Sequence, residues 1–487
     1  MVELRNERLG HSSLDSLTYE KIRWFGAKLL DLFFNEVEVV GVENVPRDGG
    51  GLVVAWHPNG IIDPALILSC LPREVVFGAR DGLFKWPLLG RLMRSIDTVP
   101  IYRAEDGGDD NQRKEANTKS LDALAEAVVN GKFAVLFPEG ISHDRSFVQP
   151  IRRGAARLYF SACDKSENQE FPSIIPVGLH YNHKRGFRSK VLVVLYPPLD
   201  MDGINHSNDE RALSTEQLTE RIESTIHEVI GATEDWETHH LMHRARRIVR
   251  LESELDDEQS RDLSPLHERA VGFARIHRGY AERLRTDPQR IGELYVRLRD
   301  YNDDIRALGF HERELGAGDI TVSPWIPLIL VIQGVMIYLL LPPILLIGYA
   351  VNSVPALFIR AVCRWGAKDK KDEATIKLLG GVVLFPIFWV MAGVLTATAH
   401  PWVAEMFPNI PATPLFAGVS VSILSAVGGA VAVRYLRLSK RLIRQIRVGF
   451  TRHRASESVY RLLAERRVIY EELISLREGL ELPEQLG

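Results

Sequence analysis

A histidine and an aspartate separated by a short turn are the residues of this sequence best suited to acid–base chemistry. The apolar run 51–56 ends at His57, and a Pro-Asn-Gly turn leads on to Asp63-Pro64. A histidine titrates near neutral pH, and a nearby carboxylate can fix its tautomer and stabilise its protonated form. Asp63 and Pro64 are typical of a helix N-cap and first helical position. The pattern predicts a strand end feeding a helix, and the alternative on spacing alone is a capping aspartate beside a structural histidine.

Three further blocks have the composition of loops at strand ends. One apolar run ends at Arg103 and another runs into a Phe-Pro-Glu-Gly turn, while a third run carries a proline. The basic, acidic and turn-forming residues in and beside these blocks are Lys85, Arg103, Glu139, Gly140, Arg145, Arg152, Arg153 and Pro176.

The elements that must position these residues read as an α/β layer. A good amphipathic helix covers 111–130 and is closed by Gly131. Strands that alternate with helices predict a mixed, largely buried sheet flanked by helices. The strand-like runs are 36–42, 51–56, 74–78, 98–102, 133–137, 174–181 and 191–196.

Composition narrows the class of protein. The chain has 487 residues and a net charge of −3, so we expect two or three domains and no nucleic-acid partner. Its three cysteines, Cys70, Cys163 and Cys363, lie far apart and offer neither a metal site nor a disulfide framework. The N-terminus lacks the apolar core of a secretory signal.

Two helical segments flank the α/β region. Residues 19–34 form an amphipathic helix that either packs on the core or contacts a membrane surface, and the sequence leaves both readings open. From about 214 to 315 the chain is charged and helical, and we expect two or three long helices with a break at Asp287-Pro288.

The last third of the chain is apolar enough to enter a bilayer. We expect a hairpin over 325–359, bent at Pro342-Pro343, and spans over 378–398 and 415–433. Basic residues cluster in 360–377 and again in 434–447. The positive-inside rule therefore places both clusters on the cytoplasmic side of an integral membrane protein. The domain that precedes the hairpin is expected on the same side, so that both ends of 325–359 are cytoplasmic.

The four blocks, in this order, resemble the glycerolipid acyltransferase family of glycerol-3-phosphate and 1-acylglycerol-3-phosphate acyltransferases. That family carries a His-x4-Asp pair, a strand ending in Arg, Phe-Pro-Glu-Gly, and a proline in an apolar strand. Here five residues separate His57 from Asp63. This departure is similar to the fungal-type glycerol-3-phosphate/dihydroxyacetone-phosphate acyltransferase branch, as is the run 140–145.

The resemblance implies roles for the residues. His57 would be the general base, oriented by Asp63, for attack of an alcohol on an acyl thioester. Arg103, Glu139, Gly140 and Pro176 match the family's substrate-binding positions, with Lys85, Arg145, Arg152 and Arg153 as further phosphate contacts. No metal or cofactor is expected, and acyl-CoA or acyl-carrier protein would be the co-substrate.

The resulting expectation is a membrane-bound acyltransferase that forms lysophosphatidic acid from glycerol 3-phosphate or dihydroxyacetone phosphate. One alternative is a 1-acylglycerol-3-phosphate acyltransferase, and an alternative of another class is a non-catalytic lipid-binding membrane protein. The expected organisation is an N-terminal helix region, a catalytic domain, a charged helical region, a membrane domain and a cytoplasmic helical tail: 1–35, 36–213, 214–322, 323–435 and 436–487.

Overall fold

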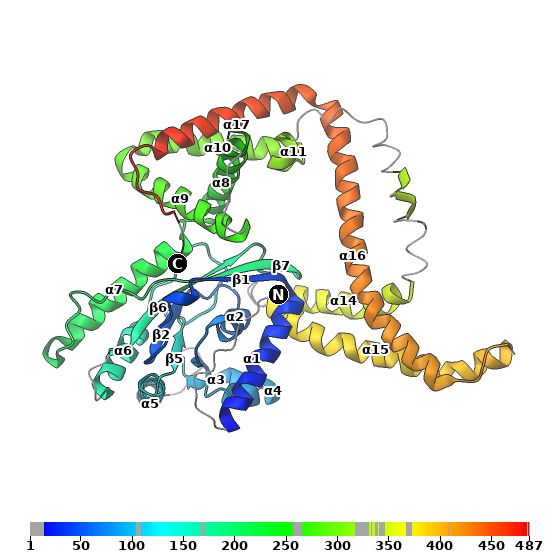
Figure 1. Cartoon of the computed structure of the whole chain (residues 1–487), viewed down its shortest axis with the longest axis horizontal. Helices are drawn as coiled ribbons and strands as arrows, with labels where there is room; N and C mark the ends of the chain where they lie inside the picture. The colour runs from blue at the N-terminus through cyan, green and yellow to red at the C-terminus, as the bar shows by residue number, and fades with distance from the viewer. Residues whose placement is uncertain are drawn as a thin grey trace.

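The computed structural model describes residues 14–103, 109–166, 171–256, 265–316, 346–366, 373–407, 409–484 and 486, together with six residues between 331 and 339. A sheet with helices on both faces forms one part of the molecule. A unit of helices lies beside it, and long helices from the last third of the chain connect the two (Figure 1).

The sheet has seven strands in the order β1-β7-β6-β2-β5-β3-β4. The five strands from β6 to β4 are parallel, whereas β7 runs antiparallel to β6 and β1 is parallel to β7. The mixed sheet is confirmed, and every strand lies within two residues of its predicted bounds. The bounds are β1 Phe34–Val40, β2 Gly51–Ala55, β3 Val75–Arg80, β4 Val99–Ile101, β5 Phe133–Leu136, β6 Ser173–Tyr181 and β7 Ser189–Leu195.

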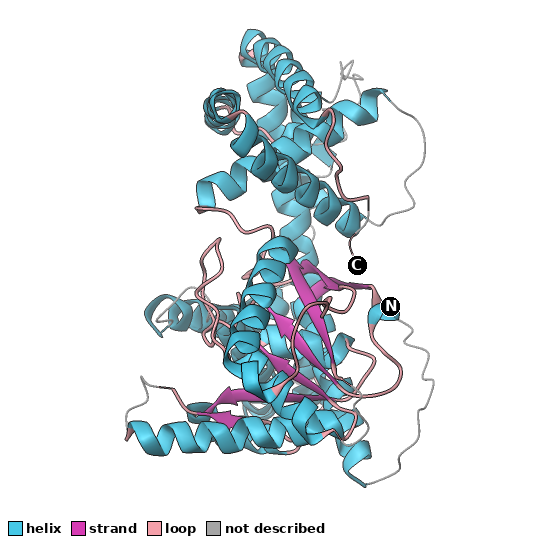
Figure 2. Cartoon of the chain, turned by 90° about the vertical axis from the view of Figure 1, so that its left-hand side faces the viewer, coloured by secondary structure: helices cyan, strands magenta, loops and turns pink. Residues whose placement is uncertain are grey.

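Helices cover both faces of the sheet (Figure 2). On one face lie α1 (Leu14–Phe33) and α2 (Ile62–Cys70), and on the other lie α5 (Asp110–Val129), α6 (Gly154–Lys165) and α7 (Arg211–Ile230). Short helices α3 (Asp81–Phe84) and α4 (Pro87–Arg94) follow β3. Because both faces are covered, β2 is buried along its whole length, which explains its uninterrupted apolar sequence.

Helix α1 packs on the core along one side, and the membrane contact that its sequence left open stays a prediction. Leu30 and Phe33 are buried in the core with α2 and the sheet, so one side of the helix packs. Trp24 and Phe25 remain 63% and 49% exposed. The packed side of α1 therefore accounts for only part of its apolar surface.

A second helical unit is built from α8 (Trp236–Asp256), α9 (Pro265–Thr286), α10 (Pro288–Ala307), α11 (Glu312–Gly316) and α17 (Ser456–Arg477). The predicted break between α9 and α10 is confirmed, because the Asp287 side chain caps α10 by accepting from the Arg290 N–H at 3.3 Å. The charged region contains four long helices rather than two or three, since α7 precedes this unit and packs on the sheet.

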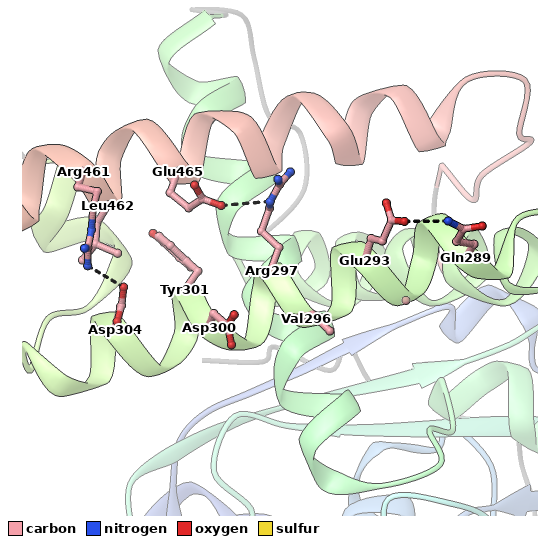
Figure 3. A pocket seen from close by; sticks show the side chains of 11 residues that line it. Gln289, Glu293, Val296, Arg297, Asp300, Tyr301, Asp304, Arg461, Leu462 and Glu465 are labelled. Atoms are coloured by element: carbon pink, nitrogen blue, oxygen red, sulfur yellow. Dashed lines mark hydrogen bonds and ion pairs between the residues drawn. The ribbon is translucent and has the colours of Figure 1, made fainter.

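Helix α17 brings the C-terminal part of the chain back onto this unit. Leu462 and Ile469 are buried against α8 and α10, and the buried Arg466 donates to Glu252 at 2.5 Å. Between α10 and α17 lies an open groove whose charged residues pair across it (Figure 3). The tail expected to be a cytoplasmic helical segment thus contributes a helix to a protein core.

Helices α14 (Leu346–Gly366), α15 (Glu373–Met406) and α16 (Pro414–Arg454) pack on one another. A buried asparagine joins them: Asn352 donates to the Ser425 carbonyl at 2.8 Å and accepts from Trp389 Nε1 at 2.9 Å. Two helices, α15 and most of α16, are long and apolar enough to cross a membrane, and they contain the predicted spans. The predicted bend at Pro342-Pro343 and most of 325–345 lie outside the described residues.

The first turns of α15 pack against the sheet layer rather than away from it. Ala374 is fully buried and Leu378 is nearly so, both in the core that also contains α1 and α2. Thr375 Oγ1 accepts from the Ile61 N–H at 3.4 Å, and Lys377 Nζ donates to the Arg185 carbonyl at 3.0 Å. The start of this apolar helix is therefore attached to the turn that precedes α2.

Candidate active site

The parallel strands bring the predicted site loops to one edge of the sheet. His57 follows β2, Arg103 follows β4, and Glu139 follows β5. The carboxyl ends of parallel strands lie at the same edge, which is where open α/β sheets bind ligands. The loop after β5 also bonds directly to the loop after β2, because the His143 N–H donates to the His57 carbonyl at 3.1 Å.

His57 and Asp63 form a direct pair. His57 Nδ1 lies 2.8 Å from Asp63 Oδ2, and the Asp63 side chain is fully buried whereas that of His57 is 16% exposed. The Asn59 backbone N–H donates to the same oxygen at 2.7 Å, and the Tyr181 hydroxyl donates to Oδ1. Since the carboxylate accepts every one of these bonds, His57 Nδ1 carries a hydrogen and Nε2 is left as the basic atom.

The local geometry of the pair differs slightly from the sequence expectation. Helix α2 begins at Ile62, so Asp63 occupies its second position and Pro64 its third, instead of N-cap and first position. The reason is the turn at Gly60, which has φ +50°, and the bond from the Ile62 N–H to the Asn59 carbonyl at 3.1 Å. Asp63 instead reaches back to the Asn59 N–H, as a residue inside the first turn does in a capping box.

An aromatic ring fixes the plane of the imidazole. The His57 ring stacks on Phe137, with centroids 4.0 Å apart and an interplanar angle of 17°. Phe137 is the first residue of the Phe-Pro-Glu-Gly turn. The imidazole is thus held at its Nδ1 edge by Asp63 and on one face by Phe137.

Glu139 is used within its own loop. Its Oε1 accepts from His143 Nε2 at 2.8 Å and from the Gln149 N–H at 2.7 Å, and the side chain is buried. His143 Nδ1 accepts from the Arg145 N–H at 3.2 Å, so the hydrogen of this imidazole sits on Nε2. Glu139 Oε2 is buried with no hydrogen-bond partner among the described residues.

Gly140 is required by the backbone of that loop. It has φ +70°, a conformation that glycine adopts without strain. A Cβ at this position would lie 3.1 Å from Nε of Arg152, whose exposed side chain crosses the glycine. The structure therefore places Arg152 beside the turn, and its role as a phosphate contact stays a prediction.

The remaining basic candidates lie at the surface with partners of their own. Lys85 is paired with Asp81 at 3.3 Å, and Arg145 donates to Gln149 at 3.1 Å. Arg153 is paired at 2.7 Å with Glu216 of α7, on the sheet face opposite α2. Of these three, only Arg145 belongs to the loop that bonds to His57.

Arg103 and Pro176 differ in their surroundings. Arg103 is partly buried just beyond the edge strand β4. Pro176 is buried inside the sheet, where β6 pairs with Val54 of β2, and its carbonyl accepts from the Tyr196 N–H at 3.0 Å. Pro176 is therefore a residue of the sheet interior beneath the site edge.

Tyr181 and the loop that follows it were not identified from the sequence. Tyr181 contacts Asp63 across 118 residues because β6 lies next to β2. In that loop the Lys184 carbonyl accepts from Asn59 Nδ2 at 2.9 Å, and Lys184 and Arg185 both pair with Asp144. The only sequence signal was the position of Tyr181 at the end of a predicted strand.

The cysteines do not supply a nucleophile. Burial raises the pKa of Cys70 to about 12 and that of Cys163 to about 11, so both thiols are protonated at neutral pH. Among the described residues no group of histidine, cysteine and acidic side chains is arranged to hold a metal ion. Of the described groups, the His57–Asp63 pair has the geometry for general acid–base chemistry on a hydroxyl.

The class of protein follows from a family comparison. Residues 36–180 match the acyltransferase family model, and this range contains His57, Asp63, Arg103, Glu139 and Pro176. The chain therefore carries an acyltransferase domain.

Individual relatives indicate which kinds of acyltransferase the chain is similar to. The chain is 24% identical to glycerol-3-phosphate O-acyltransferase 2 of Saccharomyces cerevisiae over 75% of its own length and 63% of the yeast protein, so it spans less than two thirds of that relative. It is 22% identical to the 1-acyl-sn-glycerol-3-phosphate acyltransferase of Bacillus subtilis over 38% of this chain and 86% of the relative. The family model and these relatives confirm the resemblance to the glycerolipid acyltransferases.

A solved structure gives a weak match. The crystal structure of the 1-acyl-sn-glycerophosphate acyltransferase PlsC from Thermotoga maritima shares 21% identity, covers 44% of this chain and 81% of its own, and superposes with a TM-score of 0.31.

Proposed function

We propose that this protein is a membrane-bound acyltransferase that acylates glycerol 3-phosphate to lysophosphatidate, or dihydroxyacetone phosphate to its acyl ester. The observation that carries the proposal is the buried His57–Asp63 pair inside an acyltransferase domain. The alignment with the yeast glycerol-3-phosphate acyltransferase continues well beyond residues 36–180, whereas the bacterial one covers 38% of the chain. This difference favours glycerol 3-phosphate over its acylated product as acceptor.

In the proposed reaction the acceptor hydroxyl attacks the thioester carbonyl while His57 Nε2 takes its proton. Asp63, bonded to Nδ1, stabilises the imidazolium that forms. The tetrahedral intermediate then expels the thiolate, which receives the proton from His57. Arg103 would bind the acceptor phosphate, and the free oxygen of Glu139 would accept from a glycerol hydroxyl.

The proposal that the protein is membrane-bound rests on helices α15 and α16 and on the distribution of basic residues along the sequence. Both helices have the length and hydropathy of a span. The basic clusters in 360–377 and 434–447 favour the cytoplasmic side, where acyl thioesters are made, for the catalytic domain.

The test is an acyl-transfer assay with the purified full chain and a radiolabelled palmitoyl thioester, as CoA or acyl-carrier-protein adduct. Glycerol 3-phosphate, dihydroxyacetone phosphate and lysophosphatidate are offered as separate acceptors. We expect glycerol 3-phosphate or dihydroxyacetone phosphate to have the highest kcat/KM, and His57→Ala to lose roughly 10²–10⁴-fold of it. A preference for lysophosphatidate would establish the alternative reaction. No transfer to any acceptor by a folded protein would favour a lipid-binding role.

A further inference from the structure

The helical unit contains a second cavity that shares no residue with the proposed reaction site. It lies among α8, α9, α10 and α17, and its lining residues fall between Thr238 and Leu298 and between Leu473 and Leu482. Its volume is about 230 Å³. This is below the roughly 300–1,000 Å³ of common ligand pockets, which makes the cavity too small for a nucleotide-bearing thioester and leaves room for part of a single alkyl chain.

Most of the cavity wall is apolar. Aliphatic side chains from all four helices line it, among them Met242, Val249, Val271, Leu294 and Leu473. Burial of hydrocarbon against such a wall is favourable by about 25 cal/mol per Å² of apolar surface. The wall therefore suits an alkyl chain.

The charged residues that line the same cavity are mainly cationic. They comprise one glutamate and four arginines: Glu268, Arg246, Arg250, Arg275 and Arg477. Arg250 is paired with Glu268 at 3.2 Å, and Arg275 donates to the Pro483 carbonyl at 2.7 Å. These two guanidinium groups therefore already have partners within the protein.

Arg246 is different. The residue is only 9% exposed, and its Nε atom has no hydrogen-bond partner among the described residues. Burial, together with the neighbouring Arg269 and Arg247, lowers the pKa of Arg246 to about 9, although Glu268 acts in the opposite direction. A buried N–H without an acceptor is costly, and a carboxylate could accept from Nε and a terminal nitrogen of Arg246 through two parallel bonds.

We propose that this cavity binds a free long-chain fatty acid, with its alkyl chain along the apolar wall and its carboxylate on Arg246. A carboxylate satisfies one guanidinium in a bidentate pair, whereas a glycerophosphate headgroup would need more polar room and more free donors than Arg246 supplies. This site is independent of the proposed reaction, because none of its residues comes from the sheet or from the loops around His57.

The larger groove in Figure 3 offers a contrast. It measures about 680 Å³, but its two arginines are already paired across it: Arg297 with Glu465 at 3.2 Å and Arg461 with Asp304 at 3.0 Å. It presents no buried apolar wall comparable to that of the smaller cavity. The contrast supports Arg246 as the feature that marks a ligand site.

The test is equilibrium binding of cis-parinaric acid, a fluorescent fatty acid, to the full chain in phosphatidylcholine nanodiscs without acyl donor. Palmitate, lysophosphatidate, hexadecanol and inorganic phosphate compete in separate arms. We expect palmitate to displace the probe best, and hexadecanol and phosphate to displace little. Arg246→Met should weaken binding roughly tenfold or more, since it removes a charge-assisted pair. Arg278→Gln, an exposed change on α9 outside the cavity lining, should leave binding unchanged.

Two further results separate a binding role for Arg246 from a structural one. Without ligand, Arg246→Met should raise Tm, because a thioether suits the apolar site better than an unpaired charge; a structural arginine would lower it. Leu473→Trp leaves the arginines in place but fills the cavity, so this variant should abolish binding. Binding by Arg246→Met equal to wild type, or stronger displacement by hexadecanol or lysophosphatidate than by palmitate, would overturn the proposal. His57→Ala should bind normally, so the outcome does not depend on the acyl-transfer proposal.

Discussion

Asp63→Asn is the substitution for which the structure makes the least obvious prediction. The usual expectation is that an amide rotates the catalytic histidine into the wrong tautomer. Here the Asn59 backbone N–H, 2.7 Å from Oδ2, can only donate. An asparagine at position 63 must therefore place its oxygen at the Oδ2 position, where it also accepts from His57 Nδ1. Its NH₂ group then faces the Tyr181 hydroxyl, which can turn to accept.

Asp63→Asn should therefore lower activity by removing the negative charge beside His57, and not by changing the geometry of the pair. A hydrogen bond to a charged group contributes about 1.5–3 kcal/mol and a neutral one about 0.5–1.5 kcal/mol. The difference of roughly 1–1.5 kcal/mol corresponds to about a tenfold lower kcat/KM, well short of the roughly 10²–10⁴-fold loss expected for His57→Ala. Adding Tyr181→Phe leaves the buried NH₂ without an acceptor, so the double variant should lose about 1–3 kcal/mol of stability.

The assay is acyl transfer to glycerol 3-phosphate, with ¹⁵N shifts of the His57 ring to report which nitrogen carries the hydrogen. Asp63→Asn should keep the hydrogen on Nδ1. Activity as low as that of His57→Ala, with the hydrogen moved to Nε2, would refute the argument from Asn59. Thermal unfolding of the single and double variants checks the stability effect separately.

Three other outcomes are expected. Arg103→Ala should raise KM for glycerol 3-phosphate far more than KM for the thioester, and Arg103→Lys should not restore it, because a bidentate contact is lost; an unchanged acceptor KM would assign Arg103 to structure. Cysteines introduced singly at Gly316, Lys370 and Asn409 of a cysteine-free chain should react with an impermeant thiol reagent from outside only at 409, and outside labelling at 370 would contradict the hairpin. Burial lowers the pKa of His180 to about 4. As the pH falls, this imidazole is therefore protonated in the unfolded chain before it is protonated in the folded protein. The free energy of unfolding should fall from about pH 6.5 to pH 4 by up to about 1.4 kcal/mol per pH unit. Unfolding midpoints across that range should fall less steeply in His180→Gln, and identical slopes would exclude the contribution.

The strands could be predicted from the sequence because each is a short apolar run between polar turns. The ends of the helices were harder to predict. The span expected to end near residue 433 continues as α16 to Arg454. The basic residues that follow the apolar region are good helix formers, so the helix does not end where the apolar region ends. Helix α7 has the charged surface of the helices after it, yet its apolar stripe, including Ile222 and Ile226, packs on the sheet.

The residues of the site also differ in how far the sequence alone could predict them. His57 and Asp63 are six positions apart, so a local pattern reveals them. Tyr181 reaches Asp63 only because of strand order, which no short motif encodes. Glu139 lay in a recognisable turn, but its bond to His143 depends on the folded shape of that turn.

The attachment of α15 to the turn before α2 has a consequence for how the enzyme would respond to its bilayer. Ala374 and Leu378 lie in the core of the sheet layer, and Thr375 bonds to Ile61, two positions before Asp63. A spanning helix adjusts to hydrophobic thickness by tilting. In the proposed membrane arrangement, with its first turns held in this core, α15 could not tilt without straining the Asn59–Asp63 turn or rotating the whole sheet layer. Lipid composition would then set the height and angle at which His57 meets the membrane surface.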